Sequence, residues 1–141
     1  DWVWAKETLL LDALIAKKKD VEVEVQAIQV GPVVCLSNPA EYFVSYGLQL
    51  KKRSGFPMTF PVELANGCVG YVPDEEAFGP HGGGYETRLT SYSNLEITAG
   101  TQFMNVGLEL ATKMKPAKLP ERPTAPAGKP WAYGDQPPQL K

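Results

Sequence analysis

The first third of the chain carries a helical pattern of apolar positions followed by a strand-like alternation. Residues 7–19 place leucines and an isoleucine on one face and end in three lysines, so we expect a helix there. The apolar face consists of Leu10, Leu11, Leu14 and Ile15. In residues 21–30, valines alternate with polar residues, which predicts a strand with one wet side. The alternation changes phase near Ala27 and Ile28, which indicates a bulge or a change of burial.

A turn and a second apolar run follow this predicted strand. Gly31-Pro32 is a turn signal, and residues 33–36 form a short continuous apolar run typical of a buried strand. We therefore expect a hairpin. Cys35 lies inside the run and is expected to be a small core residue. The spacing of Cys35 and Cys68 fits no zinc site. Whether the two cysteines form a disulfide is left open by the sequence.

The middle of the chain predicts a helix, a strand and a capped turn. Residues 38–39 (Asn-Pro) open a predicted helix over residues 40–53, which Gly55 ends. Prolines at positions 57 and 61 favour an edge or coil there, so the more probable strand is residues 62–65. Residues 66–73 are predicted as a loop, and Asp74 as the cap of a short helix through Phe78.

The last predicted helix runs from a cap at Thr98 to about Met114. A short strand around residues 87–90 is a weaker prediction before it. The apolar stripe expected on the last helix is Phe103, Val106, Leu110 and Met114.

The order of these elements predicts an α/β fold. We expect a small mixed sheet with flanking helices, belonging to a larger α/β catalytic domain, over residues 1–115. Prolines recur in residues 116–141, which predicts an extended proline-rich tail, strapped to a surface through Trp131 and Tyr133. So short a set of elements would leave faces exposed, which indicates that the domain packs on something else.

Composition narrows the class of protein. Hydrophobic residues make up 43% of the chain and charged residues 21%, as in globular proteins. The net charge of −2, without a basic stripe, argues against a nucleic-acid partner. No apolar run has the length of a transmembrane segment. Because the first residue is Asp rather than Met, we expect a processed product or a piece of a longer polypeptide.

Two oxygen-bearing side chains are the strongest candidates for chemistry. Glu41 falls in the first turn of the predicted helix, where it either complements the helix dipole or acts as a hard metal ligand or base. Tyr71 follows glycines at 67 and 70, which allow close backbone approach or positive φ, and is either a packed loop residue or a ligand. Asn66 is more typical of a turn than of a catalytic amide.

The remaining candidates are weaker. His81, the only histidine, lies among glycines and is expected to be solvated. Residues 82–84 (Gly-Gly-Gly) would suit a phosphate only if a helix began directly after them. The pair Tyr85-Glu86 is either structural or presents a hydroxyl to an oxyanion.

These motifs together resemble the C-terminal part of the catalytic region of neutral/alkaline (non-lysosomal) ceramidases, above all the bacterial ceramidase-like proteins. The family's Pro-Gly-Glu-Phe turn is similar to residues 38–43 (Asn-Pro-Ala-Glu-Tyr-Phe), and its Asn-x-x-x-x-Tyr-Val loop to residues 66–72. Its later Glu-Glu-Tyr/Phe and Tyr-Glu motifs are similar to residues 75–78 and 85–86. The resemblance covers about residues 20–115.

The resemblance implies a zinc-dependent amidohydrolase of sphingolipid metabolism, acting on a lipid-like N-acyl amide. Glu41 and Tyr71 would then be ligands of Zn²⁺, and Tyr85 would stabilise the oxyanion. The two remaining ligands would be histidines from an upstream segment or a second chain, so this chain alone is expected to be inactive. A periplasmic or secreted location is also implied.

The chain departs from the family pattern in several places. Ala40 replaces the family's glycine, His81 and its glycines form an insertion, and a proline-rich tail stands where the family has an immunoglobulin-like domain. Two other hypotheses stay open. The chain could be a non-catalytic scaffold or partner-binding subunit that keeps the fold, or, ranked last, a phosphate-binding domain.

Overall fold

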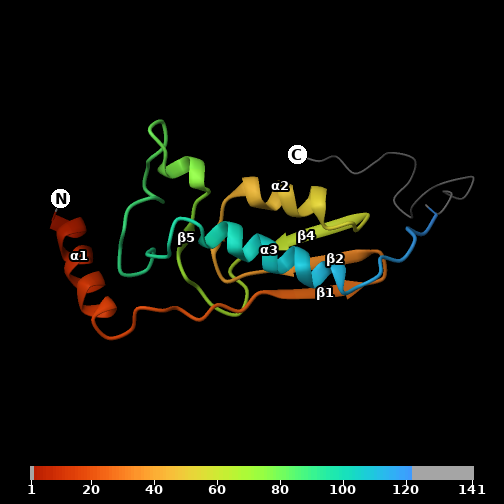
Figure 1. Cartoon of the computed structure of the whole chain (residues 1–141), viewed down its shortest axis with the longest axis horizontal. Coiled ribbons are helices and arrows are strands. Elements are labelled where there is room, and N and C mark those ends of the chain that lie inside the picture. Colours follow the sequence, from red (N-terminus) through yellow and green to blue (C-terminus); the bar gives the residue numbers. More distant parts are fainter. Residues whose placement is uncertain (1, 122–141) are drawn as a thin grey trace, which may run out of the picture.

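The computed structural model describes residues 2–121 as a small sheet with helices on one side and a helix-and-loop region at one end (Figure 1). The elements are α1 (Trp2–Ile15), β1 (Gln26–Val30), β2 (Val33–Ser37), β3 (Glu41–Tyr42), α2 (Val44–Arg53), β4 (Met58–Val62), β5 (Tyr71–Val72), the 3₁₀ helix η1 (Glu75–Phe78) and α3 (Ala99–Thr112). The α/β prediction with a small mixed sheet is confirmed. The expectation that Trp131 and Tyr133 strap the tail to a surface lies outside the described residues.

The main sheet has the order β1-β2-β4. β1 and β2 form the predicted antiparallel hairpin, and β4 pairs with β2 in parallel. β1 begins at Gln26, not at Val21 as predicted, because Gln26 pairs with Ser37 and β2 ends there. Residues 21–25 therefore have no strand opposite them.

The prediction for β4 was wrong in position. It covers residues 58–62 and includes Pro61, whereas residues 62–65 were predicted. A proline is tolerated here because β4 is an edge strand, where a missing N–H can face away from the sheet. Positive φ angles at Leu64 and Asn66 then end the extended conformation.

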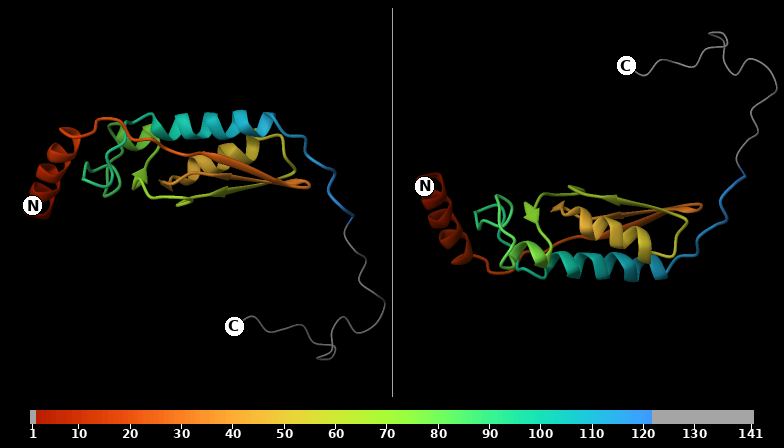
Figure 2. Two further views of the ribbon diagram at one scale, coloured as in Figure 1. Left: turned by 90° about the horizontal axis from the view of Figure 1, so that it is seen from below. Right: turned by 90° about the horizontal axis from the view of Figure 1, so that it is seen from above.

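α2 and α3 lie side by side on one face of the main sheet (Figure 2). The core between them and the sheet is made of Val34, Leu36, Tyr46, Leu50, Phe56, Met104 and Ala111. Of the stripe predicted for α3, Phe103 and Met114 pack against the core clusters as expected, whereas Val106 is 44% exposed. The buried face instead carries Ala99, Gly100, Met104, Gly107 and Ala111. Small residues allow close approach: a Cβ on Gly100 would lie 2.3 Å from the Tyr46 ring.

The start of α2 also differs from the prediction. The helix begins at Val44, and Glu41 lies on the short strand β3 before it. The Asn38 carboxamide oxygen accepts a hydrogen bond from the Ala40 N–H at 3.0 Å, which turns the chain into β3. The helix-dipole interpretation of Glu41 is therefore wrong.

Several local predictions can be compared directly. Asp74 caps η1 as predicted, accepting a hydrogen bond from the Ala77 N–H at 3.1 Å. α1 begins five residues and ends four residues earlier than predicted, and residues 87–90 form a turn, a bend and irregular coil rather than a strand. Both cysteines are free, and Cys35 is only partly buried.

Candidate functional site

A second, two-stranded sheet places Glu41 beside Tyr71. β3 pairs with β5 in parallel, and Glu41 is the register partner of Tyr71. The Glu41 N–H donates to the Gly70 carbonyl at 2.9 Å and the Phe43 N–H to the Val72 carbonyl at 3.4 Å. Side chains of register partners leave the same face of a sheet next to each other. The two candidates, separated by thirty residues in the sequence, are thus direct neighbours.

Glu41 changes the acidity of Tyr71. The pKa of Tyr71 is raised to about 12. The main cause is a hydrogen bond to the Glu41 carboxylate, and desolvation and the charge of Glu41 contribute less. Carboxylates at Glu41 and Glu86 also act on Tyr85. The site therefore has a negative potential, which favours protons and other cations.

Gly70 fixes the approach of a second segment to this pair. Its φ is +77°, and a Cβ at this position would lie 1.9 Å from the Tyr92 carbonyl oxygen. The Tyr71 N–H donates to Ser93 Oγ at 3.0 Å. The expectation of close approach is confirmed at Gly70. Gly67 needs no such freedom, since its nearest neighbour, Pro39, would be in ordinary contact at 3.5 Å.

Tyr85 lies on the other side of Tyr71. The two rings meet edge to face, with centroids 5.6 Å apart. The Tyr85 and Tyr92 hydroxyl oxygens are 3.2 Å apart, and this hydrogen bond is the main cause that raises the pKa of Tyr85. All three predicted site residues, Glu41, Tyr71 and Tyr85, therefore gather at one end of the molecule. Tyr92 was not predicted, because nothing in its local sequence marks it.

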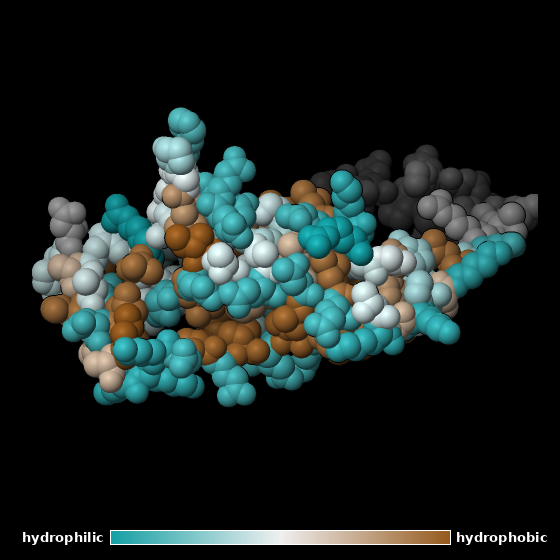
Figure 3. Space-filling view, in the orientation of Figure 1, coloured by the Kyte–Doolittle hydropathy of each residue, from teal (hydrophilic) through white to brown (hydrophobic). Residues whose placement is uncertain are grey.

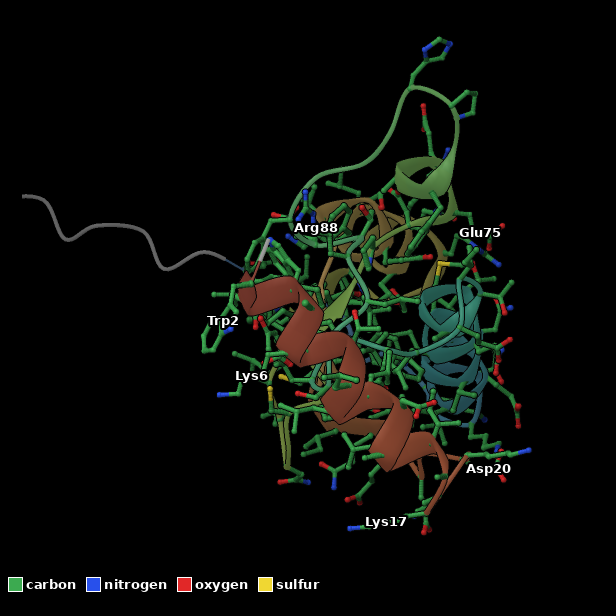
Figure 4. All side chains as sticks on the ribbon, turned by 90° about the vertical axis from the view of Figure 1, so that its left-hand side faces the viewer. Trp2, Lys6, Lys17, Asp20, Glu75 and Arg88 are labelled. Carbon is green, nitrogen blue, oxygen red and sulfur yellow. The ribbon has the colours of Figure 1, made fainter. Side chains whose placement is uncertain are left out.

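α1 closes this end of the molecule (Figure 4). The Glu7 carboxylate accepts hydrogen bonds from the Ser91 N–H at 3.1 Å and from Ser91 Oγ at 2.6 Å. The Trp4 and Tyr85 ring centroids are 5.8 Å apart, and Arg88 lies over the Trp4 ring at 4.6 Å. Sequence reasoning missed these contacts, since 84 positions separate Glu7 from Ser91.

A groove lies beside this region, and none of Glu41, Tyr71 and Tyr85 lines it. Its volume is about 900 Å³, and it lies between α1, residues 17–23 and the start of α3. Leu14, Val23, Leu95 and Phe103 contribute apolar walls, and Tyr92 is also a lining residue. The lining includes charged side chains as well, among them Lys17, Lys18, Lys19 and Glu96. Figure 3 shows apolar surface gathered beside α3 on this side of the molecule.

The other candidates lie apart from this chemistry. His81 is exposed, and no helix follows Gly84, so the condition set for a phosphate-binding loop is not met. Asn66 is exposed with a φ of +59°, in agreement with a turn residue.

The metal-ligating side chains of residues 2–121 do not form a complete metal site. Within residues 2–121, no three histidine, cysteine, aspartate or glutamate side chains gather as a metal site would require. None of the helices in that range is both long and apolar enough to cross a membrane. Glu41 and Tyr71 could therefore provide only part of a coordination shell. Comparison with models of known families, with curated proteins and with solved structures found no match.

Proposed function

We propose that this chain is part of a zinc-dependent amidohydrolase that cleaves a lipid-like N-acyl amide. Glu41 and Tyr71 are two of its metal ligands, and the others come from a segment that is not in this chain. The observation that carries the proposal is the register pairing of Glu41 with Tyr71, which sets two oxygen ligands side by side.

The donor set suits a zinc ion. Carboxylate oxygens are common zinc ligands, and a catalytic zinc site keeps a coordination position for water or substrate. When bound, zinc supplies Lewis-acid polarisation and a water acidic enough to attack at neutral pH. Since Glu41 raises the pKa of Tyr71 to about 12, Tyr71 must release its proton on binding a cation, and affinity should rise with pH.

Tyr85 is suited to donate a hydrogen bond rather than to ionise. A phenol is protonated at neutral pH, and the raised pKa of Tyr85 opposes its ionisation further. The Tyr92 hydroxyl at 3.2 Å and the Tyr71 ring restrict where the Tyr85 hydroxyl can point. A phenol held in this way can donate to the oxyanion that develops on an amide carbonyl oxygen.

The groove supports a substrate with a long apolar part. Its volume of about 900 Å³ falls in the range of ligand sites, and Tyr92 both lines it and contacts Tyr85. An acyl chain lying along Leu95 and Phe103 would reach Tyr92, whose hydroxyl is hydrogen-bonded to Tyr85.

The first experiment is the intact mass and the zinc content of the natural protein, followed by variants. We expect a stoichiometric zinc ion in a protein or complex much heavier than 15.4 kDa. Glu41→Gln and Tyr71→Phe should each lose the ion, whereas the exposed Glu76→Gln should keep it. Unchanged zinc affinity in both site variants would refute the proposal.

The role of Tyr85 needs a separate test on the zinc-loaded protein. Tyr85→Phe should lower kcat toward an N-acyl amide about a hundredfold or more, with zinc content unchanged. Tyr92→Phe, which removes the neighbouring hydroxyl, is the matched control and should lose less. Equal losses in both variants would contradict a donor role for Tyr85.

The alternative is a non-catalytic scaffold or partner-binding subunit. The observation that favours it is the exposure of apolar side chains on the main sheet, where Ile28, Val30 and Phe60 are 48–68% exposed. A metal-free protein with the mass of this chain alone would support this alternative.

A further inference from the structure

Asn66 and Gly67 form the only Asn-Gly pair in the chain, and their surroundings favour a covalent change of the asparagine. Asparagine is thermolabile because its carboxamide can react with the backbone nitrogen of the next residue. The reaction requires a carboxamide that is free to move and a backbone nitrogen that is unhindered and not held in a hydrogen bond. The surroundings of each asparagine therefore decide whether it reacts.

Both requirements are met at Asn66. Asn66 and Gly67 are exposed and form a bend outside any helix or strand, with a φ of +59° at the asparagine. Among the hydrogen bonds of residues 2–121, none involves the Asn66 carboxamide or the Gly67 N–H. Glycine also has no Cβ that could shield its nitrogen. The carboxamide carbon and the nitrogen that would attack it are thus both accessible.

The other three asparagines of the chain do not meet these requirements. Asn38 is 4% exposed and precedes Pro39, whose nitrogen has no proton to lose. The Asn94 carboxamide donates to the Thr90 carbonyl at 3.1 Å. Asn105 is exposed but lies inside α3, where the helix hydrogen bonds hold the N–H of the next residue. The reaction should therefore be specific for the Asn-Gly pair.

Asn66 lies in the segment that joins β4 to β5 and supports the backbone before Glu41 (Figure 1). The N–H groups of Ala65 and Val69, on either side of Asn66, donate to the carbonyls of residues 38–39 at 3.0 and 2.9 Å. These two hydrogen bonds hold the turn from which the chain enters β3. A change in the main chain at Asn66 therefore acts directly on the support of Glu41.

The reaction has two steps and consumes one water molecule. First, the Gly67 nitrogen loses its proton to solvent and forms a bond to Asn66 Cγ, while the Cγ–Nδ2 bond breaks and Nδ2 takes up a proton and leaves as ammonia. Water then opens the cyclic succinimide. Hydrolysis of the new N–Cγ bond gives aspartate, whereas hydrolysis of the original peptide bond gives isoaspartate, whose main chain runs through Cβ and Cγ.

We propose that Asn66 is a site of spontaneous deamidation, and that its isoaspartate product loosens the turn before Glu41. Isoaspartate adds a methylene group to the main chain between the N–H groups of Ala65 and Val69. Because the spacing of these two donors changes, both hydrogen bonds cannot keep their present geometry. Aspartate at the same position keeps the spacing and adds only an exposed charge.

The test incubates the full chain in mildly alkaline buffer, which promotes loss of the Gly67 amide proton. Tandem mass spectrometry of peptides locates the deamidated residue, and enzymatic methylation of the isoaspartyl carboxylate measures isoaspartate. Gly67→Ala is the matched variant, because a Cβ there has only Pro39 nearby, in ordinary contact at 3.5 Å. Circular dichroism checks that this variant keeps the fold, and Asn105 is the internal control.

We expect aspartate and isoaspartate at position 66, with isoaspartate in excess, and no measurable conversion of Asn105. Gly67→Ala should lose most of the product, since its methyl group hinders the attacking nitrogen. Three results would each overturn the deamidation site: no product at position 66, equal conversion of Asn66 and Asn105, or equal rates in Gly67→Ala and wild type.

Hydrogen exchange tests the effect on the turn. The isoaspartate form, separated by chromatography, should lose protection at the amides of Ala65, Val69 and Glu41, whereas Asn66→Asp should keep it. Equal protection in the two forms would leave the modification in place and refute its effect on the turn. Neither measurement involves zinc or catalysis, so both results are independent of the proposed function.

Discussion

Replacing Gly70 by alanine tests how the candidate site is held together. Gly70 immediately precedes Tyr71, has a φ of +77°, and faces the segment that carries Tyr92 and Ser93. An alanine Cβ would lie 1.9 Å from the Tyr92 carbonyl oxygen and 2.5 Å from Ser93 Oγ. Since real Cβ atoms do not approach so closely, either β5 or this segment must move.

Two separate terms contribute to the loss of stability expected for Gly70→Ala. A non-glycine residue in the left-handed region costs about 1–2 kcal/mol. Forcing an extra methyl group into a packed site costs about 1–3 kcal/mol more. We therefore expect Gly70→Ala to lower the free energy of unfolding by about 2–5 kcal/mol, a large share of the stability of a domain this size.

Gly55 provides the matched control. Its φ is also +77°, but a Cβ there has no neighbour within 4 Å, so Gly55→Ala should pay only the backbone cost. Urea denaturation gives both values. The pKa of Tyr71, followed by its absorbance, should also shift in Gly70→Ala and not in Gly55→Ala. Equal destabilisation by the two variants, with an unchanged Tyr71 pKa, would refute the packing of this segment on Gly70.

Three further predictions follow from the described contacts. Glu41→Gln removes the carboxylate that holds the pKa of Tyr71 at about 12, so a spectroscopic titration should find that pKa nearer its ordinary value; no change would contradict the contact. Glu7 has a lowered pKa because of its hydrogen bonds to Ser91, so its stabilisation is present above its ordinary pKa and is lost as pH falls through the folded value. The protection factors of amides in residues 84–94, relative to the unfolded chain at the same pH, should accordingly fall in acid, and Glu7→Gln should reduce this pH dependence. Gly107→Ala meets only neighbours at 3.7–4.0 Å and should stabilise α3 by about 0.5–1 kcal/mol in thermal unfolding, whereas a loss would show that the helix is packed too tightly for a methyl group.

The parts of the fold that were predicted correctly depend on neighbours in the sequence. The hairpin follows from Gly31 between two apolar runs, and the cap of η1 follows from Asp74 three residues before Ala77. α3 also starts after Thr98 as predicted, although the Thr98 side chain makes no capping hydrogen bond. Turn and capping chemistry acts over a few residues, so the sequence pattern contains it.

The errors arose where distant segments decide the local structure. β3 has two residues and exists through its pairing with β5, so nothing near Glu41 distinguishes a strand from a helix start. On α3, contacts are made by Gly100 and Gly107, which a search for large apolar side chains overlooks.

In the candidate site, too, some features could be predicted from the local sequence and others depend on distant segments. The residue types and motifs drew attention to Glu41, Tyr71 and Tyr85, and the fold brings these three together. Their catalytic roles stay predictions. The supporting residues Glu7 and Tyr92 could not be found from the sequence, because their importance lies only in contacts across the chain.

Pro61 determines which edge of the main sheet can pair with a further strand. Within β4, the Val62 carbonyl accepts from the Asn38 N–H on the side of β2, so the position of Pro61, one residue earlier, turns its backbone outward. Because proline has no backbone N–H, β4 lacks a hydrogen-bond donor at this outward position. An additional strand therefore cannot form a continuous ladder along β4. β1 has no strand partner on its outer side among residues 2–121 and keeps its donors. Any intermolecular extension of the sheet, whether productive assembly or aggregation during overexpression, should therefore begin along β1.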